Sequence, residues 1–184
     1  MKRDFNSIIS SSPLMLTEGS IIERLRREYR YDLNIDILNA NCIYDPKGKK
    51  ILEEMYRQYI TIGKSRNIPL ILFTPTWRAN PERLGKAGMM LKDVNGENYR
   101  FIDSLRNEQA IYAEKILIGG LIGCKGDAYK PEEALSVDEA FHFHQTQTRA
   151  LANAGVDFLF AATLPAFTEA LGIAKAMALT AVPY

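Results

Sequence analysis

Pro69-Leu70-Ile71-Leu72-Phe73-Thr74 is a short apolar segment with a proline before it and a threonine after it. An unbroken apolar run of this length is typical of a parallel strand that is buried on both faces, since a strand with one wet face alternates apolar and polar residues. Apolar residues at helical spacing over 51–62 precede the segment, and a long loop over 75–96 and a helical stretch over 97–113 follow it. The pattern therefore predicts one strand of a parallel α/β sheet.

Three further apolar runs, at 14–17, 115–122 and 156–162, are also predicted to be strands, and a helical pattern follows each of them. Ser20 and Glu23 have the spacing of a capping box at the start of the first helix. Ser136 and Gly155 suit the N-cap and C-cap of a later helix, and Pro165 opens a last one that runs to about residue 179. Strands that alternate with helices predict right-handed βαβ units in one parallel sheet, with strand order 1-2-3-4.

The segments outside these units are predicted to be irregular. Residues 1–12 have the composition of a polar arm, and residues 31–48 end in Asp45-Pro46-Lys47-Gly48, a turn sequence. At the other end, Thr180-Ala181-Val182-Pro183-Tyr184 is an apolar lead-in where a fifth strand is expected to begin. We therefore expect a single domain over 1–184 that is truncated before its fifth strand.

Composition excludes several classes of function. The 184 residues suit one domain, and 47% hydrophobic with 24% charged residues is typical of a soluble globular protein. A net charge of +1 gives no basic field for nucleic acid. Apolar runs fall short of the roughly 18 residues of a membrane span, and the N-terminus has no apolar core of a signal peptide. We expect a cytoplasmic protein that keeps both of its cysteines, Cys42 and Cys124, reduced.

In parallel α/β folds, ligands bind at the carboxyl ends of the strands. Four polar clusters follow the predicted strands, and together they predict one shared cleft. The candidate substrate-binding residues are Glu18, Gly19, Thr74, Thr76, Trp77, Arg78, Cys124, Asp127 and Thr163.

Four of these candidates have both a functional and a structural interpretation. Glu18 is placed to hold a ligand amine or to act as a base, or else to be stabilised by a helix dipole. Arg78 suits a carboxylate, with Trp77 stacking on the ligand, but pairing with Glu82 is the alternative. Cys124 is either a thiol activated by a nearby cation or an inert small residue in a glycine-rich turn.

A metal site is not predicted from the residues, and no catalytic residue is assigned. Two isolated cysteines do not supply the three or so protein ligands that zinc takes. His142 and His144 are two residues apart, so on a helix they point in different directions, and His144 is interpreted as a hydrogen-bonded packing residue. The glycines around Gly119 and Gly123 form neither of the common nucleotide-binding motifs.

Taken in order, these clusters resemble the homocysteine S-methyltransferase family, the zinc-dependent TIM barrels that move a methyl group to the thiol of homocysteine. The segments that carry the resemblance are Leu16-Thr17-Glu18-Gly19 with Glu23, Thr74-Pro75-Thr76-Trp77-Arg78-Ala79-Asn80-Pro81, Gly119-Gly120-Leu121-Ile122-Gly123, Phe143-His144 with Gln147, Leu151 and 154–158, and Ala162-Thr163-Leu164-Pro165 with Glu169-Ala170. The resemblance covers nearly the whole chain but only the first half of the family barrel. It implies an α/β fold made of the first four of eight parallel βα units.

The resemblance also implies differences in chemistry. The family's zinc cysteines come from later strands, so zinc is not expected to be bound by this chain. The family glutamate that grips the substrate amine corresponds to Ala162, and the family's opening aspartate corresponds to Thr17, with Glu18 beside it. A small-molecule thiol or amino acid is the implied substrate, and this fragment is expected to be inactive in methyl transfer.

Two other functions stay open. One is a non-catalytic half-barrel module for binding or self-association; the other is an unrelated TIM-barrel lyase or aldolase that uses Glu18 and Lys125. A half barrel leaves open edges and a bare sheet face, so we expect a homo-oligomer or a missing C-terminal half as partner. The residues expected on that bare face are Leu70, Leu72, Ile116, Ile118, Phe158 and Phe160.

Overall fold

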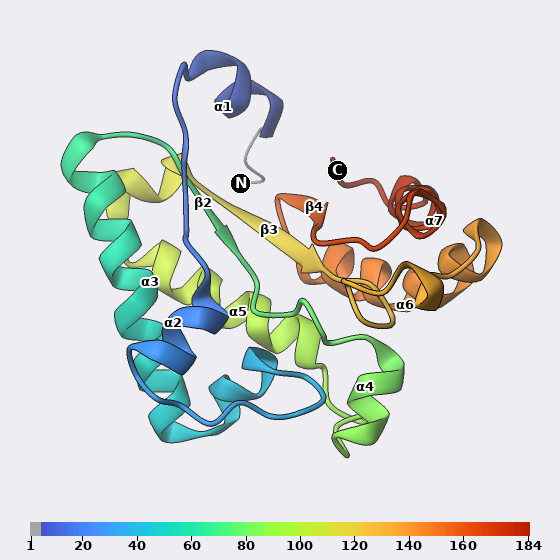
Figure 1. The fold of residues 1–184 in the computed structure, drawn as a ribbon. Helices are drawn as coiled ribbons and strands as arrows, with labels where there is room; N and C mark the ends of the chain where they lie inside the picture. Colours follow the sequence, from blue (N-terminus) through green and yellow to red (C-terminus); the bar gives the residue numbers. More distant parts are fainter. Residues whose placement is uncertain (1–4) are drawn as a thin grey trace.

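The computed structural model describes residues 5–184 and contains one parallel sheet (Figure 1). Its strands are β1 (Leu16–Thr17), β2 (Leu70–Phe73), β3 (Ile116–Ile122) and β4 (Phe158–Ala161), in the order β1-β2-β3-β4. All three neighbouring pairs are parallel, and the register places Leu70 opposite Ile116 and Gly119 opposite Phe158. The predicted parallel sheet and its strand order are confirmed.

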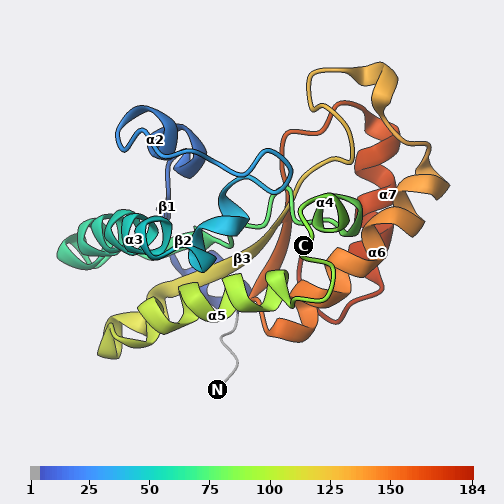
Figure 2. The same cartoon turned by 90° about the horizontal axis from the view of Figure 1, so that it is seen from below.

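The helices are α1 (Phe5–Ser11), α2 (Ile21–Arg27), α3 (Pro46–Arg66), α4 (Pro81–Lys86), α5 (Val94–Asn107), α6 (Val137–Ala154) and α7 (Phe167–Ala178), with 3-10 helices at Asn39–Tyr44, Ala110–Lys115 and Pro131–Glu133. The helices other than α1 follow the strands and cover the outer side of the sheet, whereas α1 precedes β1 and packs on the opposite face. Figures 1 and 2 show α3, α5, α6 and α7 in an arc around the outer side of the sheet. No helix within residues 5–184 is both long and apolar enough to cross a membrane.

Local sequence sets several helix ends as expected. Ser136 and Glu139 form a complete capping box at the start of α6, and Gly155 ends that helix with φ of 104°, in the left-handed region that glycine adopts without strain. At Ser20 one half of the expected box is present, because its hydroxyl accepts the backbone N–H of Glu23. The N-cap at Ser136 and the C-cap at Gly155 are confirmed, whereas the capping box predicted at Ser20 is only half formed, because the Glu23 carboxylate pairs with Arg26 and Arg27.

Three segments differ from the sequence prediction. The supposed turn at Asp45-Pro46-Lys47-Gly48 is the start of α3, because the Asp45 carboxylate accepts the Gly48 N–H and proline suits the first helical turn. Within the polar arm, residues 5–11 form α1, whereas residues 1–4 lie outside the described residues. The loop over 75–96 contains α4, which Asn80 caps.

The sheet face that was expected to be bare is mostly covered, so that prediction is wrong for five of its six residues. Leu70, Leu72, Ile116 and Ile118 are buried in the main core with residues of the outer helices, and Phe158 is 5% exposed. Side chains alternate along a strand, so the opposite face carries Phe73, Phe158 and Phe160 instead. Phe5 of α1 packs on Phe158 with ring centroids 4.9 Å apart. Of the six residues expected on the bare face, Phe160 alone is exposed, at 43%.

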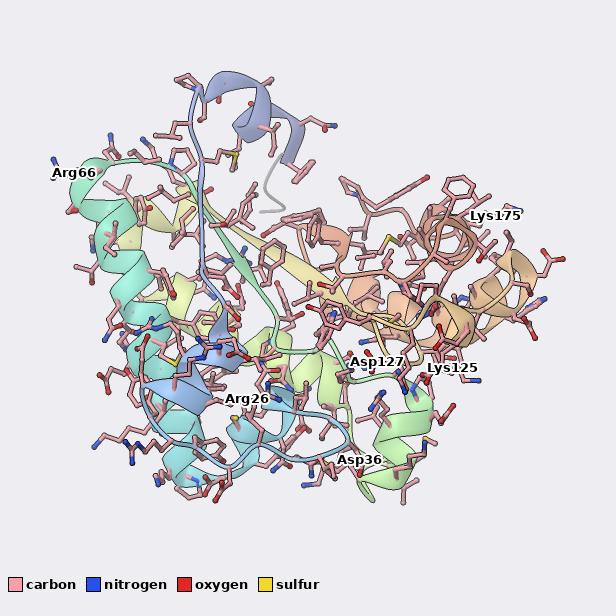
Figure 3. All side chains as sticks on the ribbon, viewed as in Figure 1. Arg26, Asp36, Arg66, Lys125, Asp127 and Lys175 are labelled. Carbon is pink, nitrogen blue, oxygen red and sulfur yellow. The ribbon has the colours of Figure 1, made fainter. Side chains whose placement is uncertain are left out.

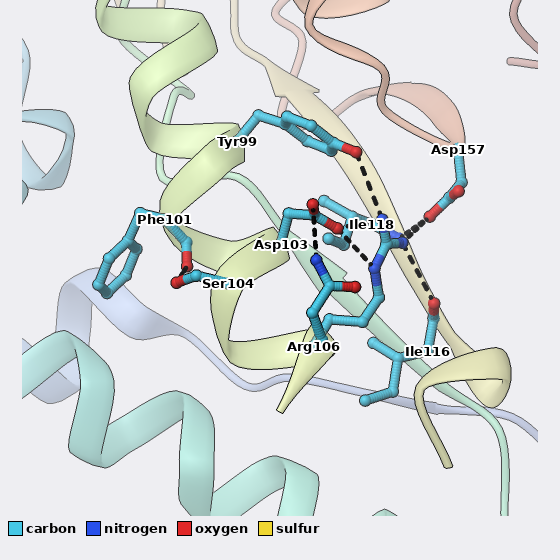
Figure 4. Close-up of polar contacts among 9 residues, drawn as sticks. Tyr99, Phe101, Asp103, Ser104, Arg106, Ile116, Ile118 and Asp157 are labelled. Atoms are coloured by element: carbon cyan, nitrogen blue, oxygen red, sulfur yellow. Dashed lines mark hydrogen bonds and ion pairs between the residues drawn. The ribbon is translucent and has the colours of Figure 1, made fainter. Parts of the chain in front are cut away.

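A buried ion pair joins α5 to the sheet (Figure 4). The Arg106 guanidinium donates to the Asp157 carboxylate at 2.5 Å and to Asp103 at 2.5 Å. Asp157 also accepts the backbone N–H of Ile118 at 2.7 Å, immediately before β4 begins. Burial by itself lowers the pKa of Arg106, but the facing carboxylates raise it above its usual value. The network therefore holds α5, β3 and the start of β4 in register.

The chain end lies along the outer edge of β4. The Leu159 N–H donates to the Pro183 carbonyl at 2.8 Å, and Val182 is buried in the core. Residues 182–184 thus run beside β4, where the sequence predicts a fifth strand to begin.

Candidate functional site

A cavity of about 440 Å³ opens at the carboxyl ends of β1, β2 and β4. Five of the predicted site residues line it: Glu18, Gly19, Thr74, Trp77 and Thr163. Apolar side chains that complete the wall include Phe73, Leu121 and Phe160. The position matches the expectation that ligands bind at the carboxyl ends of parallel strands.

Glu18 places a carboxylate in the wall of this cavity. It follows β1 directly, and its Oε2 accepts the backbone N–H of Phe73 at 2.9 Å. Protein atoms crowd the carboxylate, and this desolvation raises the pKa of Glu18 well above its ordinary value, against a smaller lowering by the Phe73 N–H. A carboxyl group with a raised pKa can accept or release a proton nearer to neutral pH, or it can pair with a cationic ligand group.

Thr74 and Thr76 extend the pairing of β2 and β3 beyond the last regular residue. Their hydroxyls are 2.7 Å apart, the Thr76 hydroxyl donates to the Leu121 carbonyl, and the Leu121 N–H donates to Thr74. Both side chains are fully buried. Thr74 still borders the cavity, but Thr76 does not line it and supports the loop behind it.

Trp77 forms the partition at the centre of the site. Its indole N–H donates to the Ala162 carbonyl at 3.0 Å, which links the loop after β2 to the end of β4. A Cβ atom at Gly123 would lie 2.6 Å from the indole nitrogen, so only glycine fits there. The Arg78 guanidinium stacks over the indole, 4.3 Å from the ring centroid.

The other predicted residues do not line the first cavity, so the structure does not bring all of them into one shared cleft. Arg78 and Asp127 line a second cavity of about 710 Å³, which borders the first at Trp77. The alternative pairing of Arg78 with Glu82 is wrong, because Arg78 donates to the Gly126 carbonyl and Glu82 pairs with Lys86.

Cys124 lines neither cavity. Its side chain is fully buried, and its thiol contacts the Gly126 carbonyl at 3.4 Å. Burial raises the pKa of Cys124, against smaller lowering by Arg78 and Arg83. The inert interpretation of this thiol therefore fits better than the activated one.

Sequence reasoning missed a buried pair behind the site. His144 Nε2 lies 3.1 Å from the Glu169 carboxylate, and both side chains are fully buried. Glu169 also accepts the backbone N–H groups of Lys125 and Leu135, so α7 holds the loop after β3. His144 is a hydrogen-bonded packing residue, as predicted, but nothing in the local pattern identifies Glu169 as its partner across 25 residues.

Two cavity residues have strained backbones. Thr163 has φ of 57° and Leu38 has φ of 48°, which is costly for residues with a branched or bulky side chain. Leu38 and Asn39 come from the 31–48 segment, which sequence patterns described only as irregular, yet both line the first cavity. Backbone strain of this kind gathers at ligand sites, and it is invisible in a residue pattern.

The donor set does not fit a zinc ion. Within residues 5–184 no group of three or more His, Cys, Asp and Glu side chains converges as a metal site would require. Cys42 lies in the Asn39–Tyr44 helix, where burial raises its thiol pKa to about 12, and Cys124 lies in the loop after β3. The two thiols belong to different segments and favour the protonated form, so they do not provide the thiolate ligands that zinc takes.

Comparison with known proteins identifies the family. The family model described as homocysteine S-methyltransferase matches residues 15–184. Homocysteine S-methyltransferase YbgG of Bacillus subtilis (strain 168) is 22% identical in an alignment 183 residues long, and the match covers 91% of this chain and 56% of that protein. The chain thus spans about half the length of the curated relative it matches.

Solved structures show the same fold. The metallated form of homocysteine methyltransferase MmuM from Escherichia coli aligns with a TM-score of 0.72 at 19% identity, over 94% of this chain and 62% of that one. Its apo form aligns with a TM-score of 0.60 at 19% identity, over 93% of this chain and 57% of that one. The four βα units described above are therefore part of a TIM barrel. By the match of its family model over nearly all its length, this chain belongs to the homocysteine S-methyltransferase family.

Proposed function

We propose that this chain forms the amino-acid-binding part of a methyltransferase that acts on a thiol such as homocysteine. The observation that carries the proposal is the Glu18 carboxylate in the wall of the first cavity, at the carboxyl end of β1. A partly desolvated carboxylate attracts an ammonium group more strongly than an exposed one does, since the surrounding dielectric is lower. The family membership gives this pairing its context.

In this proposal each part of the cavity has a task. Glu18 holds the amine of the amino acid and thereby takes the place of the family glutamate at Ala162. Phe73, Leu121 and Phe160 provide the apolar wall along which the thiol side chain lies. Trp77, fixed by Ala162, closes the far side. Methyl transfer itself belongs to the whole protein, and the group that activates the thiol lies outside this chain's own cavity.

The test compares L-homocysteine with 4-mercaptobutanoate, the same molecule without its amine, by calorimetric titration of the 184-residue chain. The expected result is that homocysteine binds about tenfold or more tightly than 4-mercaptobutanoate, in line with 1.5–3 kcal/mol for a charged hydrogen bond. Glu18→Gln should abolish this preference, whereas the exposed control Glu108→Gln should keep it. Equal binding of the two thiols by the unmodified chain would refute the amine-holding role.

A second candidate is a binding or self-association module without catalysis. The observation that favours it is the exposed Phe160 on the inner face of the sheet, next to Phe73 with ring centroids 5.0 Å apart. Self-association without homocysteine binding would favour this candidate. A cytoplasmic location fits both candidates and is supported by Cys42 and Cys124, which are both free thiols.

A further inference from the structure

The second cavity is strongly cationic. Six of its lining side chains are basic and three are acidic: Arg26, Arg78, Arg83, Lys86, Lys125 and Lys130 against Glu82, Asp127 and Glu133. It borders the first cavity, with which it shares Arg26, Leu38 and Trp77. Figure 3 shows Arg26, Lys125 and Asp127 at this end of the molecule, with Arg66 at the opposite end.

The acidic side chains in this cavity are already engaged. Glu82 pairs with Lys86 at 2.8 Å, and Glu133 pairs with Lys130 at 3.1 Å. The Asp127 carboxylate accepts the backbone N–H of Tyr129 at 3.0 Å. Within residues 5–184, neither Arg78 nor Arg83 forms an ion pair with a carboxylate.

The two guanidinium groups are held in place by neutral partners. Arg78 stacks on Trp77 and donates to the Gly126 carbonyl. Arg83 donates to the carbonyls of Asp36 and Lys125, at 3.3 Å each. Its Nε atom is buried and has no hydrogen-bond partner among the described residues. Both groups keep N–H donors that these bonds do not use, since a guanidinium carries five.

Such an arrangement is unfavourable without an anion. Burial of Arg78 and the neighbouring positive charge of Arg83 lower the pKa of Arg78, against smaller raising by Cys124 and Asp127. A carboxylate or phosphate between them would relieve the repulsion and would satisfy the free donors in a forked geometry.

We propose that the second cavity is a binding site for the carboxylate or phosphate group of a small-molecule ligand, with Arg78 and Arg83 as its principal donors. The ligand group sits beyond Trp77, on the side away from Glu18. Because the cavities adjoin at Trp77, a ligand longer than a simple amino acid spans both of them. Binding of an anion here does not require the amino-acid site proposed above.

The test titrates the chain separately with inorganic phosphate and with glutarate, and follows the fluorescence of Trp77, the only tryptophan. At least one of the two anions is expected to saturate the signal, and the one that does identifies the ligand group. Arg83→Gln is expected to weaken that anion about tenfold or more, as the loss of a charged hydrogen bond does. The matched control Arg66→Gln removes one positive charge from the exposed last turn of α3 and is expected to leave binding within about twofold, since screening limits distant charges.

The proposal would be overturned if neither anion saturated the fluorescence signal, or if Arg83→Gln and Arg66→Gln weakened anion binding equally. Arg83→Lys is a second variant, because it keeps the charge without the fork; it is expected to restore only part of the affinity. Glu18→Gln is expected to leave anion binding unchanged and to abolish the preference for homocysteine. The two proposals therefore fail separately.

Discussion

At the scale of single residues, the negative charge of Glu18 serves ligand binding in the proposed function but lowers the stability of the folded chain. Its carboxyl group has a raised pKa in the folded chain because burial disfavours its charged form. The folded state therefore binds a proton that the unfolded state releases at lower pH. It follows that Glu18 makes the folded chain progressively less stable as pH rises from its ordinary pKa of 4.5 through its raised value.

The first prediction concerns Glu18→Gln. The amide oxygen can still accept the Phe73 N–H, but the side chain cannot ionise. The gain in melting temperature over the unmodified chain is therefore expected to be larger at about pH 8 than at about pH 5, where less of the carboxylate is charged. Thermal unfolding followed by circular dichroism at both pH values measures it. A gain that is independent of pH would contradict a raised pKa at Glu18.

A second residue-scale prediction concerns the contact between Gly123 and Trp77. In Gly123→Ala the new Cβ would overlap the indole, displacing it and breaking its bond to Ala162. We expect a red shift of tryptophan emission and a loss of about 1–3 kcal/mol of stability, as for overpacking elsewhere. The control Gly85→Ala meets only the flexible end of Met90, and its emission should match that of the unmodified chain. An unshifted spectrum in Gly123→Ala would show that Trp77 is not held as described.

At the scale of secondary-structure elements, polar side chains hold the parts of the barrel together. Arg106 of α5 reaches Asp157 before β4, and Glu169 of α7 reaches His144 of α6 and the loop after β3. The net lowering of the Glu169 pKa comes from His144 and backbone N–H groups, which outweigh the raising by burial. A group with a lowered pKa stabilises the fold above its ordinary pKa, and this contribution is lost as pH falls through the folded value.

The element-scale prediction concerns Arg106→Met. It leaves the buried Asp157 carboxylate without its cation, and loss of one partner of a buried pair costs about 3–5 kcal/mol. Urea unfolding should show this loss, and Arg106→Met combined with Asp157→Asn should recover part of it. Arg57→Met, which breaks the exposed pair with Glu108, should cost about 1 kcal/mol or less. Equal effects of the two single variants would contradict a structural role for the buried network.

At the scale of the whole molecule, the sheet has unequal edges. β1 is the first strand of the sheet order and pairs only with β2 within residues 5–184, whereas Pro183 already accepts the Leu159 N–H on the outer side of β4. The inner face is partly covered by α1 through Phe5 and Phe158, and Phe160 remains exposed. The open surface is therefore smaller than the sequence predicts, and it is centred on Phe160 and the edge of β1.

The whole-molecule prediction is that this chain self-associates at micromolar concentration, because an unpaired strand edge and an exposed aromatic face both favour contact with another copy. Light scattering measures the mass. Phe160→Asp should shift the population towards the monomer without loss of the folded signal. A monodisperse, cooperatively unfolding monomer of the unmodified chain would contradict this prediction.

Much of the architecture was determined by the sequence itself. The apolar run at Leu70–Phe73, the capping box at Ser136 and the glycine at Gly155 act over a few residues, so their effect can be read locally. The same holds for the placement of Glu18 and Trp77, because residues in the segment that follows a parallel strand start at the carboxyl edge of the sheet. The turn sequence at Asp45 was misread because a capping aspartate followed by proline serves both a turn and a helix start.

Only the tertiary structure decided how these residues are grouped. Trp77 separates Arg78 from Glu18 because its indole bonds to Ala162, 85 residues away. Within residues 5–184, Arg78 and Arg83 form no ion pair with a carboxylate, because Glu82 pairs with Lys86 instead. Glu169 and Asp157 find partners 25 and 51 residues away. Sequence periodicity reports which way a side chain faces along its own element, but pairing between elements depends on packing that closes long loops, and that information is not present in any local pattern.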